Sequence, residues 1–220
     1  MPVPQASAGA SPAGPAPTGV IDRPIRHWAA DRLAEPHGGA LRTKLAIFGA
    51  LFPLVIALDL VTKRWALEAL AGGRRMELFG GLVPLTLAFN KGAAFGIRFG
   101  EDSRWFFVPV TVVALVLLGL LFRQAARDDH LRIASLSLVV SGAVGNLYDR
   151  IRWGRGVVDF IGPIDLGFWD FPIFNVADMS ISCGAVLLAL SFWQEERRER
   201  KERGEVGASG TQDAAREPLG

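Results

Sequence analysis

Residues 105–122 read WFFVPVTVVALVLLGLLF, an apolar run of 18 residues without a charge. A helix needs about 20 predominantly apolar residues to cross the hydrocarbon core of a bilayer, whereas a helix of a soluble protein shows a polar face at every turn. Two further uncharged runs have the same character, LAIFGALFPLVIAL at residues 45–58 and IASLSLVVSGAVGNLY at residues 133–148. The sequence therefore predicts an all-α integral membrane protein that crosses the bilayer several times.

Four transmembrane helices are expected from these runs and from a fourth, less apolar stretch that contains Asp178. Their predicted bounds are Lys44–Ala66, Trp105–Phe122, Leu131–Leu147 and Ile173–Trp193. Together they predict one membrane domain over residues 44–193, with two long loops over residues 67–104 and 149–172.

The two ends of the chain differ from this domain in composition. Residues 1–20 are rich in Pro, Ala, Gly and Ser and carry no charge, and residues 195–203 read EERRERKER. Segments of the first kind cannot bury enough apolar surface to fold, and dense mixed charge is typical of a solvated helix end. We expect a disordered tail over residues 1–43 and a charged, solvated tail over residues 194–220.

The distribution of Lys and Arg predicts the orientation. With the amino terminus in the cytoplasm, 13 basic residues lie in short cytoplasmic segments next to the spans, against nine spread over the two long outer loops. Basic residues close to the membrane favour the cytoplasmic side, so we expect both termini there. In the first outer loop, Gly80 and Gly81 separate short apolar stretches and Pro84 interrupts the second, a pattern that favours a hairpin in a small extracytoplasmic sheet.

Several classes of function are excluded by the inventory of residues. Cys183 is the only cysteine, and His27, His37 and His130 all lie outside the apolar runs. Disulfide frameworks, CxxC metal sites and histidine-based catalysis inside the membrane are therefore not expected, and neither is a metal or another cofactor. The net charge of +2 is small, and the basic residues are scattered, so we expect no nucleic-acid partner.

Polar residues gather where the predicted spans meet the outer surface. These residues are Asp59 and Lys63 at the end of span one, Asn146, Asp149 and Arg150 at the end of span three, Asn175 and Asp178 at the start of span four, and Asn90 and Asp159 in the outer loops. Ionisable groups at membrane depth cost roughly 2.5–3.5 kcal/mol each to insert and normally mark functional sites.

Simpler roles are open for some of these residues. Asp59 and Lys63 have the i, i+4 spacing of an ion pair, Asp149 and Arg150 can anchor to lipid headgroups, and Asp178 can cap the fourth helix.

Two carboxylates held close together in a site of low dielectric do not both ionise easily, so one keeps a proton near neutral pH. The ionised carboxylate can then activate water while its protonated partner donates to a carbonyl oxygen, as in aspartic proteases.

Four segments of the chain, in this order, resemble those of the lipoprotein signal peptidase family, also called signal peptidase II. They are DLVTK at 59–63, FNKGAAFG at 89–96, GNLYDR at 145–150 followed by VVDF at 157–160, and FNVAD at 174–178. The resemblance covers about residues 45–193. It implies an aspartyl endopeptidase of the bacterial inner membrane, with four transmembrane helices and a small extracytoplasmic β cradle. We expect the active site at the outer face, where the polar residues gather, and we expect the chain to be a monomer.

Such an enzyme cleaves the signal peptide of a prolipoprotein just before its diacylglyceryl-modified cysteine, so the implied partners are a lipid-modified prolipoprotein and membrane lipid. By position, Asp159 and Asp178 match the catalytic dyad. The resemblance also implies residues that line, brace or support the site, namely Asp59, Lys63, Asn90, Asn146, Arg150 and Asn175.

One spacing differs from the family pattern, because the stretch from Arg150 to Asp159 is one residue longer than usual. We expect the turn at Gly154 to Gly156 to absorb the extra residue, since glycine tolerates unusual backbone angles.

Two other functions stay open. One is a proton-coupled carrier that uses its intramembrane carboxylates, and the other is a scaffold that binds lipid headgroups through Arg150, Arg152 and Arg155.

Overall fold

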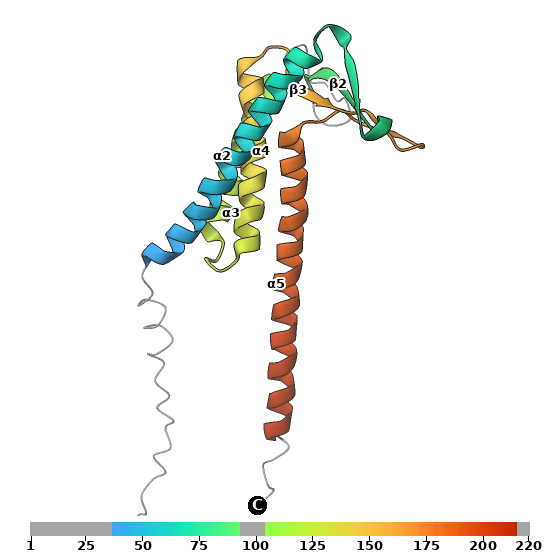
Figure 1. Cartoon of the computed structure of the whole chain (residues 1–220). Coiled ribbons are helices and arrows are strands. Elements are labelled where there is room, and N and C mark those ends of the chain that lie inside the picture. The colour runs from blue at the N-terminus through green and yellow to red at the C-terminus, as the bar shows by residue number, and fades with distance from the viewer. Residues whose placement is uncertain (1–36, 93–103, 215–220) are drawn as a thin grey trace, which may run out of the picture. The chain divides into compact units, whose positions relative to one another are not determined.

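The computed structural model describes residues 37–92 and 104–214, with side chains over 41–92 and 104–201. Within these ranges four helices are long and apolar enough to cross a membrane. They are α2 (His37–Ala69), α3 (Arg104–Gln124), α4 (His130–Arg152) and α5 (Val176–Ala214), shown in Figure 1. The predicted fold class of four membrane-spanning helices with a small sheet is confirmed.

The first and last helices extend beyond the predicted spans. α2 begins at His37, before the expected start at Lys44, and the rest of the predicted disordered tail lies outside the described residues. α5 continues past Trp193 to Ala214. Glu, Arg and Lys are good helix formers, and a pair such as Arg200 with Glu196, 2.6 Å apart, supports one further turn. The predicted charged tail is therefore largely a prolongation of the fourth membrane helix.

Small residues allow α4 to lie directly against α5 along its length. A Cβ atom on Gly142 would collide with the carbonyl oxygen of Ala177, and one on Gly184 would lie 2.8 Å from the carbonyl oxygen of Ser135. Buried hydroxyls on α4 are satisfied within the helix, because Ser137 and Ser141 each donate to the carbonyl four residues earlier. Close backbone approach of this kind is typical of helices that pack inside a membrane.

Three antiparallel strands form the predicted small sheet. β1 (Arg75–Leu78), β2 (Val83–Asn90) and β3 (Val157–Ile161) follow each other in that spatial order. The expected hairpin is present between β1 and β2, and its turn uses Gly80 (φ 70°) and Gly81 (φ 100°), backbone angles that glycine adopts without strain. Part of the segment that predicted this hairpin, residues 93–97, lies outside the described residues.

The sheet is fixed to the carboxyl end of α2 by an apolar core of Ala66, Leu70, Leu85 and Phe160. Figure 1 shows the sheet at this end of the helices, and a second hairpin of β4 (Ile164–Asp165) and β5 (Asp170–Phe171) follows β3. Because Phe160 is held in this core, its neighbour Asp159 faces the other side of the strand. The core thereby determines where the Asp159 carboxylate points.

Candidate active site

Asp159 lies on β3, opposite Ala88 of β2, and its side chain is buried. Its Oδ1 atom accepts a hydrogen bond of 2.6 Å from Nδ2 of Asn175, which precedes α5. The same amide nitrogen lies 3.3 Å from the carbonyl oxygen of Val158. The Asp159 carboxylate is therefore held by a residue that is distant in the sequence.

Asp178 lies in the first turn of α5 and exchanges two hydrogen bonds with Asn175. The Asp178 backbone N–H donates to Oδ1 of Asn175 (2.9 Å), and the Asn175 backbone N–H donates to Oδ2 of Asp178 (3.2 Å). This reciprocal arrangement is a capping box, so Asp178 has the capping role that its position allowed. Its second oxygen, Oδ1, is left for other contacts and accepts a 2.7 Å bond from Nδ2 of Asn146.

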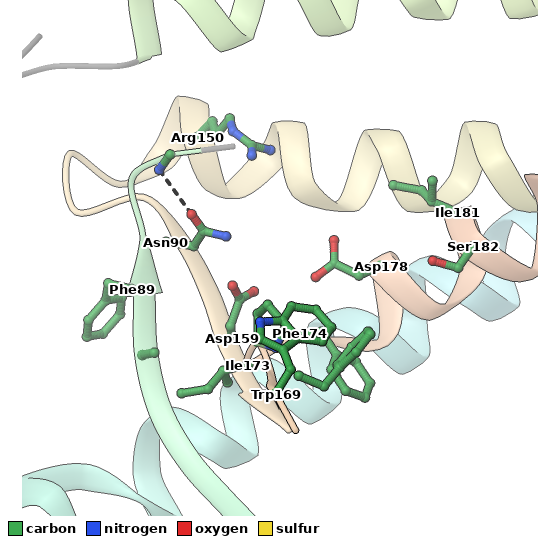
Figure 2. A pocket seen from close by; sticks show the side chains of 14 residues that line it. Phe89, Asn90, Arg150, Asp159, Trp169, Ile173, Phe174, Asp178, Ile181 and Ser182 are labelled. Carbon is green, nitrogen blue, oxygen red and sulfur yellow. Dashed lines mark hydrogen bonds between the residues drawn. The ribbon is translucent and has the colours of Figure 1, made fainter. Parts of the chain in front are cut away.

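Two asparagine side chains connect the two aspartates. Oδ1 of Asn146 accepts from Nδ2 of Asn175 (3.1 Å), which in turn holds Asp159, while Asn146 donates to Asp178. The carboxylates therefore come from different segments and share one hydrogen-bonded network. Figure 2 shows both of them directed into the same cavity from β3 and α5.

Behind this network lies a buried cluster of charges centred on Lys63. Its Nζ atom is 2.7 Å from Oδ2 of Asp59 and 2.9 Å from Oδ2 of Asp149, and it also donates to Oδ1 of Asn146 (3.1 Å). Asp59 and Lys63 thus pair as their spacing indicates. Asp149 is buried in this cluster, which excludes the alternative in which its carboxylate anchors to lipid headgroups.

The cluster also ties the helices to the sheet. Oδ1 of Asp59 accepts from the backbone N–H of Ala177 at the start of α5 (3.0 Å), and Oδ2 of Asp149 accepts from the backbone N–H of Val158 on β3 (3.2 Å). Each carboxylate therefore positions the backbone next to one of the two candidate catalytic aspartates. Sequence reasoning did not predict the link through Asp149. The signal was its spacing, because Asp149 follows Asn146 by three residues and therefore lies on the same face of the helix.

A cavity of about 590 Å³ opens in front of the two aspartates (Figure 2). Its polar lining comes from Asn90, Arg150, Asp159 and Asp178, and its apolar wall includes Phe171, Ile173, Phe174 and Ile181. These wall residues were not predicted as part of the site, because single apolar residues in or next to a membrane span carry no signal that distinguishes a cavity wall from a membrane contact. A few polar groups in a largely apolar cavity are typical of a binding site.

Arg150 and Asn90 flank the carboxylates in Figure 2. The Arg150 guanidinium carbon lies 5.4 Å from the ring centroid of Phe107 on α3, and Nη1 donates weakly to the carbonyl oxygen of Asn146 (3.4 Å). The Asn90 Oδ1 atom accepts from the backbone N–H of Gly92 (3.0 Å). All eight predicted site residues therefore belong to the cavity or to the network directly behind it.

Burial and, to a lesser degree, the nearby Asp178 carboxyl raise the pKa of Asp159 from 3.8 to about 7, while hydrogen bonds from Asn175 and Asn90 and the charge of Lys63 act in the opposite direction. A carboxyl group with such a pKa carries a proton for a large part of the time near neutral pH. The two aspartates can thus supply one acid and one base at the same place.

Gly154 to Gly156 form the turn that was expected to absorb the extra residue before Asp159. Gly156 has φ 97°, and a Cβ atom there would collide with the carbonyl oxygen of Asn90. Arg155 lies over the ring of Phe89 (4.2 Å) and over that of Trp153 (4.8 Å). Gly156 therefore permits the close approach of the chain before β3 to the end of β2. Gly96, in the second of the resembling segments, lies outside the described residues.

Comparison with known proteins agrees with this geometry. The chain is 42% identical over 151 residues to a lipoprotein signal peptidase of Hydrogenovibrio crunogenus, covering 67% of this chain and 86% of that protein. It is 37% identical to one of Geobacter metallireducens, covering 74% and 99% of the two chains. Relatives in Streptococcus pyogenes with the same name are 38% identical, covering 70% and 97%.

Two solved structures of bacterial membrane enzymes share the fold. One has a TM-score of 0.62 at 31% identity, covering 69% of this chain and 90% of that one, and the other has 0.60 at 32%, covering 67% and 93%. The family model for signal peptidase II matches residues 51–194. This match favours a peptidase over the carrier and the lipid-binding scaffold. The chain is a multi-pass membrane protein that belongs to the signal peptidase II family.

Proposed function

We propose that this protein is an aspartyl endopeptidase that removes the signal peptide from diacylglyceryl-modified prolipoproteins by cutting before the lipidated cysteine. Asp159 and Asp178 form its catalytic dyad. The observation that carries the proposal is the hydrogen-bonded path Asp159–Asn175–Asn146–Asp178, which holds two carboxylates of separate segments at one cavity. The names of the relatives supply the substrate class.

The chemistry follows from one proton shared by the two carboxyl groups. The ionised member takes a proton from a water molecule as the water oxygen attacks the carbonyl carbon of the scissile amide. The protonated member donates to the carbonyl oxygen, which gives a neutral tetrahedral intermediate. A proton then passes to the amide nitrogen, the C–N bond breaks, and an amine and a carboxyl group are released. No metal takes part in these steps.

The supporting residues have separate tasks in this mechanism. Asn146 and Asn175 fix the separation of the carboxylates, and Lys63 with Asp59 and Asp149 holds the backbone behind them. The cationic Arg150 and the amide of Asn90 are placed at the cavity to contact polar groups of the substrate. The apolar wall is suited to the signal segment and the acyl chains.

The location of the cavity fits a substrate that is itself embedded in the membrane. Asp178 and Asn146 lie near the ends of two helices that are long and apolar enough to span a membrane. The boundary where water meets hydrocarbon is expected at such helix ends. With both termini in the cytoplasm of a bacterium, as the Lys and Arg distribution predicts, this boundary is the outer face of the inner membrane. We propose that the enzyme works there as a monomer surrounded by membrane lipid.

The test compares Asp159→Asn and Asp178→Asn with Asp128→Asn, a change to an exposed aspartate in the loop between α3 and α4. Cleavage of a lipidated precursor is measured with the purified full chain in lipid nanodiscs. Each of the first two changes is expected to lower the rate by at least about 10²–10⁴-fold, the usual contribution of a positioned acid or base. Asp128→Asn is expected to retain activity. Undiminished cleavage by either dyad variant would overturn the proposal.

A further inference from the structure

A second, smaller cavity lies between the carboxyl-terminal parts of α2 and α4. It has a volume of about 210 Å³ and shares no lining residue with the cavity of the two aspartates. Its polar lining comes from Lys63, Arg64, Tyr148, Asp149 and Arg152. The proposed peptidase activity uses neither Arg64 nor Arg152, so the basic side of this cavity is unexplained.

The accessible charges of this cavity are cationic. Lys63 is neutralised by the two buried carboxylates beside it, whereas Arg64 is exposed and pairs with Glu68, a carboxylate that is itself exposed, at 2.6 Å. Ion pairs between exposed side chains contribute only about 0–1 kcal/mol. The guanidinium of Arg64 can therefore exchange Glu68 for another anion at little energetic cost.

Arg152 is held at the opposite side of the cavity by aromatic rings. Its guanidinium carbon lies 4.8 Å from the ring centroid of Trp153 and 5.6 Å from that of Tyr148, and Nη1 donates to the Tyr148 hydroxyl. A guanidinium held in place in this way loses less conformational entropy when it binds an anion, and its planar fork matches two phosphate oxygens. Among the described residues, no carboxylate forms an ion pair with Arg152.

The surroundings favour a lipid over a soluble anion. Leu60 and Leu67 line the same cavity, and both helices that form it are membrane spans. Trp and Tyr side chains, such as Trp153 and Tyr148, are enriched where headgroups meet the hydrocarbon. An anion with an attached glycerol and acyl chains can therefore contact the arginines and the leucines at the same time.

We propose that this cavity binds the phosphate group of an anionic glycerophospholipid, with Arg64 and Arg152 as the phosphate ligands. The lipid lies on the side of Lys63 that faces away from the two aspartates. Its binding holds the ends of α2 and α4 together from the membrane side. The site is independent of peptide cleavage, so it is tested by binding alone.

The experiment measures retention of phosphatidylglycerol by the full chain in nonionic detergent, using native mass spectrometry across a lipid titration. The variant Arg64→Gln/Arg152→Gln is compared with Arg197→Gln. Arg197 is a matched control because its guanidinium also stacks on an aromatic ring, that of Trp193 (4.0 Å), but on the distal part of α5. We expect about a tenfold loss of affinity for each guanidinium removed, the scale of one charge-assisted hydrogen bond, and no loss in the control.

A third variant keeps both arginines and is designed to strengthen lipid binding instead of weakening it. Glu68→Gln takes away the carboxylate that competes for Arg64, so it is expected to tighten the binding of phosphatidylglycerol. Equal retention by the wild type and the double variant would overturn the proposal, and so would a Glu68→Gln variant that binds no tighter. The assignment to an anionic lipid would be overturned if soluble glycerol phosphate competed for the site as well as phosphatidylglycerol does. It would also be overturned if phosphatidylcholine were retained as well as phosphatidylglycerol.

Discussion

Asn175 and Asp178 bind each other through two reciprocal hydrogen bonds across the first turn of α5, and each uses its remaining side-chain atoms to reach the rest of the site. Asn175 donates to Asp159, and Asp178 accepts from Asn146. One capping box therefore joins the start of a membrane helix to both candidate catalytic carboxylates. This relationship leads to the first prediction.

Replacing Asn175 by serine is expected to separate its two roles. Serine is a good helix N-cap, so α5 should still begin at the same place. The Nδ2 donor to Asp159 and Asn146 is lost, however, and the carboxylates are no longer held together. We expect thermal stability in detergent to fall by only about 1–2 kcal/mol while cleavage falls at least about tenfold. A variant that retains full activity would contradict the positioning role.

Replacing Lys63 by methionine is expected to destabilise the protein strongly. The change leaves Asp59 and Asp149 buried without their shared cation, and breaking a buried ion pair in this way costs about 3–5 kcal/mol. The control is Arg200→Met, which breaks an exposed i, i+4 pair and should cost less than about 1 kcal/mol. Thermal unfolding in detergent measures both variants. Equal losses in the two would show that the Lys63 cluster is not structural.

The raised pKa of Asp159 predicts a dependence of stability on pH. The folded chain binds the proton with a pKa of about 7, against 3.8 for the unfolded chain, so this contribution to stability is complete below about pH 4 and is lost as the pH rises through 7. Above that value the buried carboxylate opposes folding by up to about 4 kcal/mol.

Asp159→Asn removes that charge, so it should unfold at a higher temperature than the wild type near about pH 8 and at a similar temperature near about pH 4. Asp165→Asn, a change to an exposed aspartate of β4, should show no such dependence. Thermal scans of the three proteins at a series of pH values make the comparison. A variant that is less stable than the wild type at high pH would contradict the burial argument.

Gly156→Ala is expected to disturb the site through the backbone. The residue has φ 97°, and the new Cβ atom would meet the carbonyl of Asn90, so β2 and β3 must move apart. We expect a loss of stability of about 1–3 kcal/mol together with lower activity. Gly154→Ala is the matched control, because the nearest atoms to its added Cβ are 3.9 Å away. Comparable losses in both variants would contradict the prediction.

Removing metal ions is expected to leave the activity unchanged, because two carboxyl groups and water suffice for the proposed steps. Cleavage of a lipidated precursor is measured before and after treatment with a chelator. A loss of activity that zinc restores would contradict the assignment of an aspartic mechanism.

Most of the fold follows from uncharged runs whose length matches a bilayer, which is why α3 was predicted within a few residues. The ends of the helices were harder to predict because specific contacts determine them. α5 begins at Val176 because Asn175 caps it and because Phe174 pairs with Ile161 of the sheet. At the other end of α5, helix-forming charged residues carry the helix beyond the apolar run.

The sequence predicted at which end of the helices the site lies, but not which of its residues contact each other. The alternation of spans placed the polar residues at one end of the helices, whereas the contacts among them depend on how each helix is rotated. Arg150, Arg152 and Arg155 were grouped as headgroup ligands, yet they face three different surroundings. Arg150 lines the larger cavity, Arg152 the smaller one, and Arg155 stacks on Phe89. Residues two apart on a helix point in nearly opposite directions, which charge counting cannot detect.

The capping box at the start of α5 makes the proposed activity sensitive to fraying. Asp178 has one oxygen bound to the backbone of its own helix, so the dyad exists only while that turn is wound. Mild denaturants, or detergents that remove the surrounding lipid, should therefore abolish the proposed activity at concentrations that leave the helical circular dichroism signal of the whole protein unchanged. A small molecule that unwinds this one turn would inhibit the protein without occupying the place of its substrate.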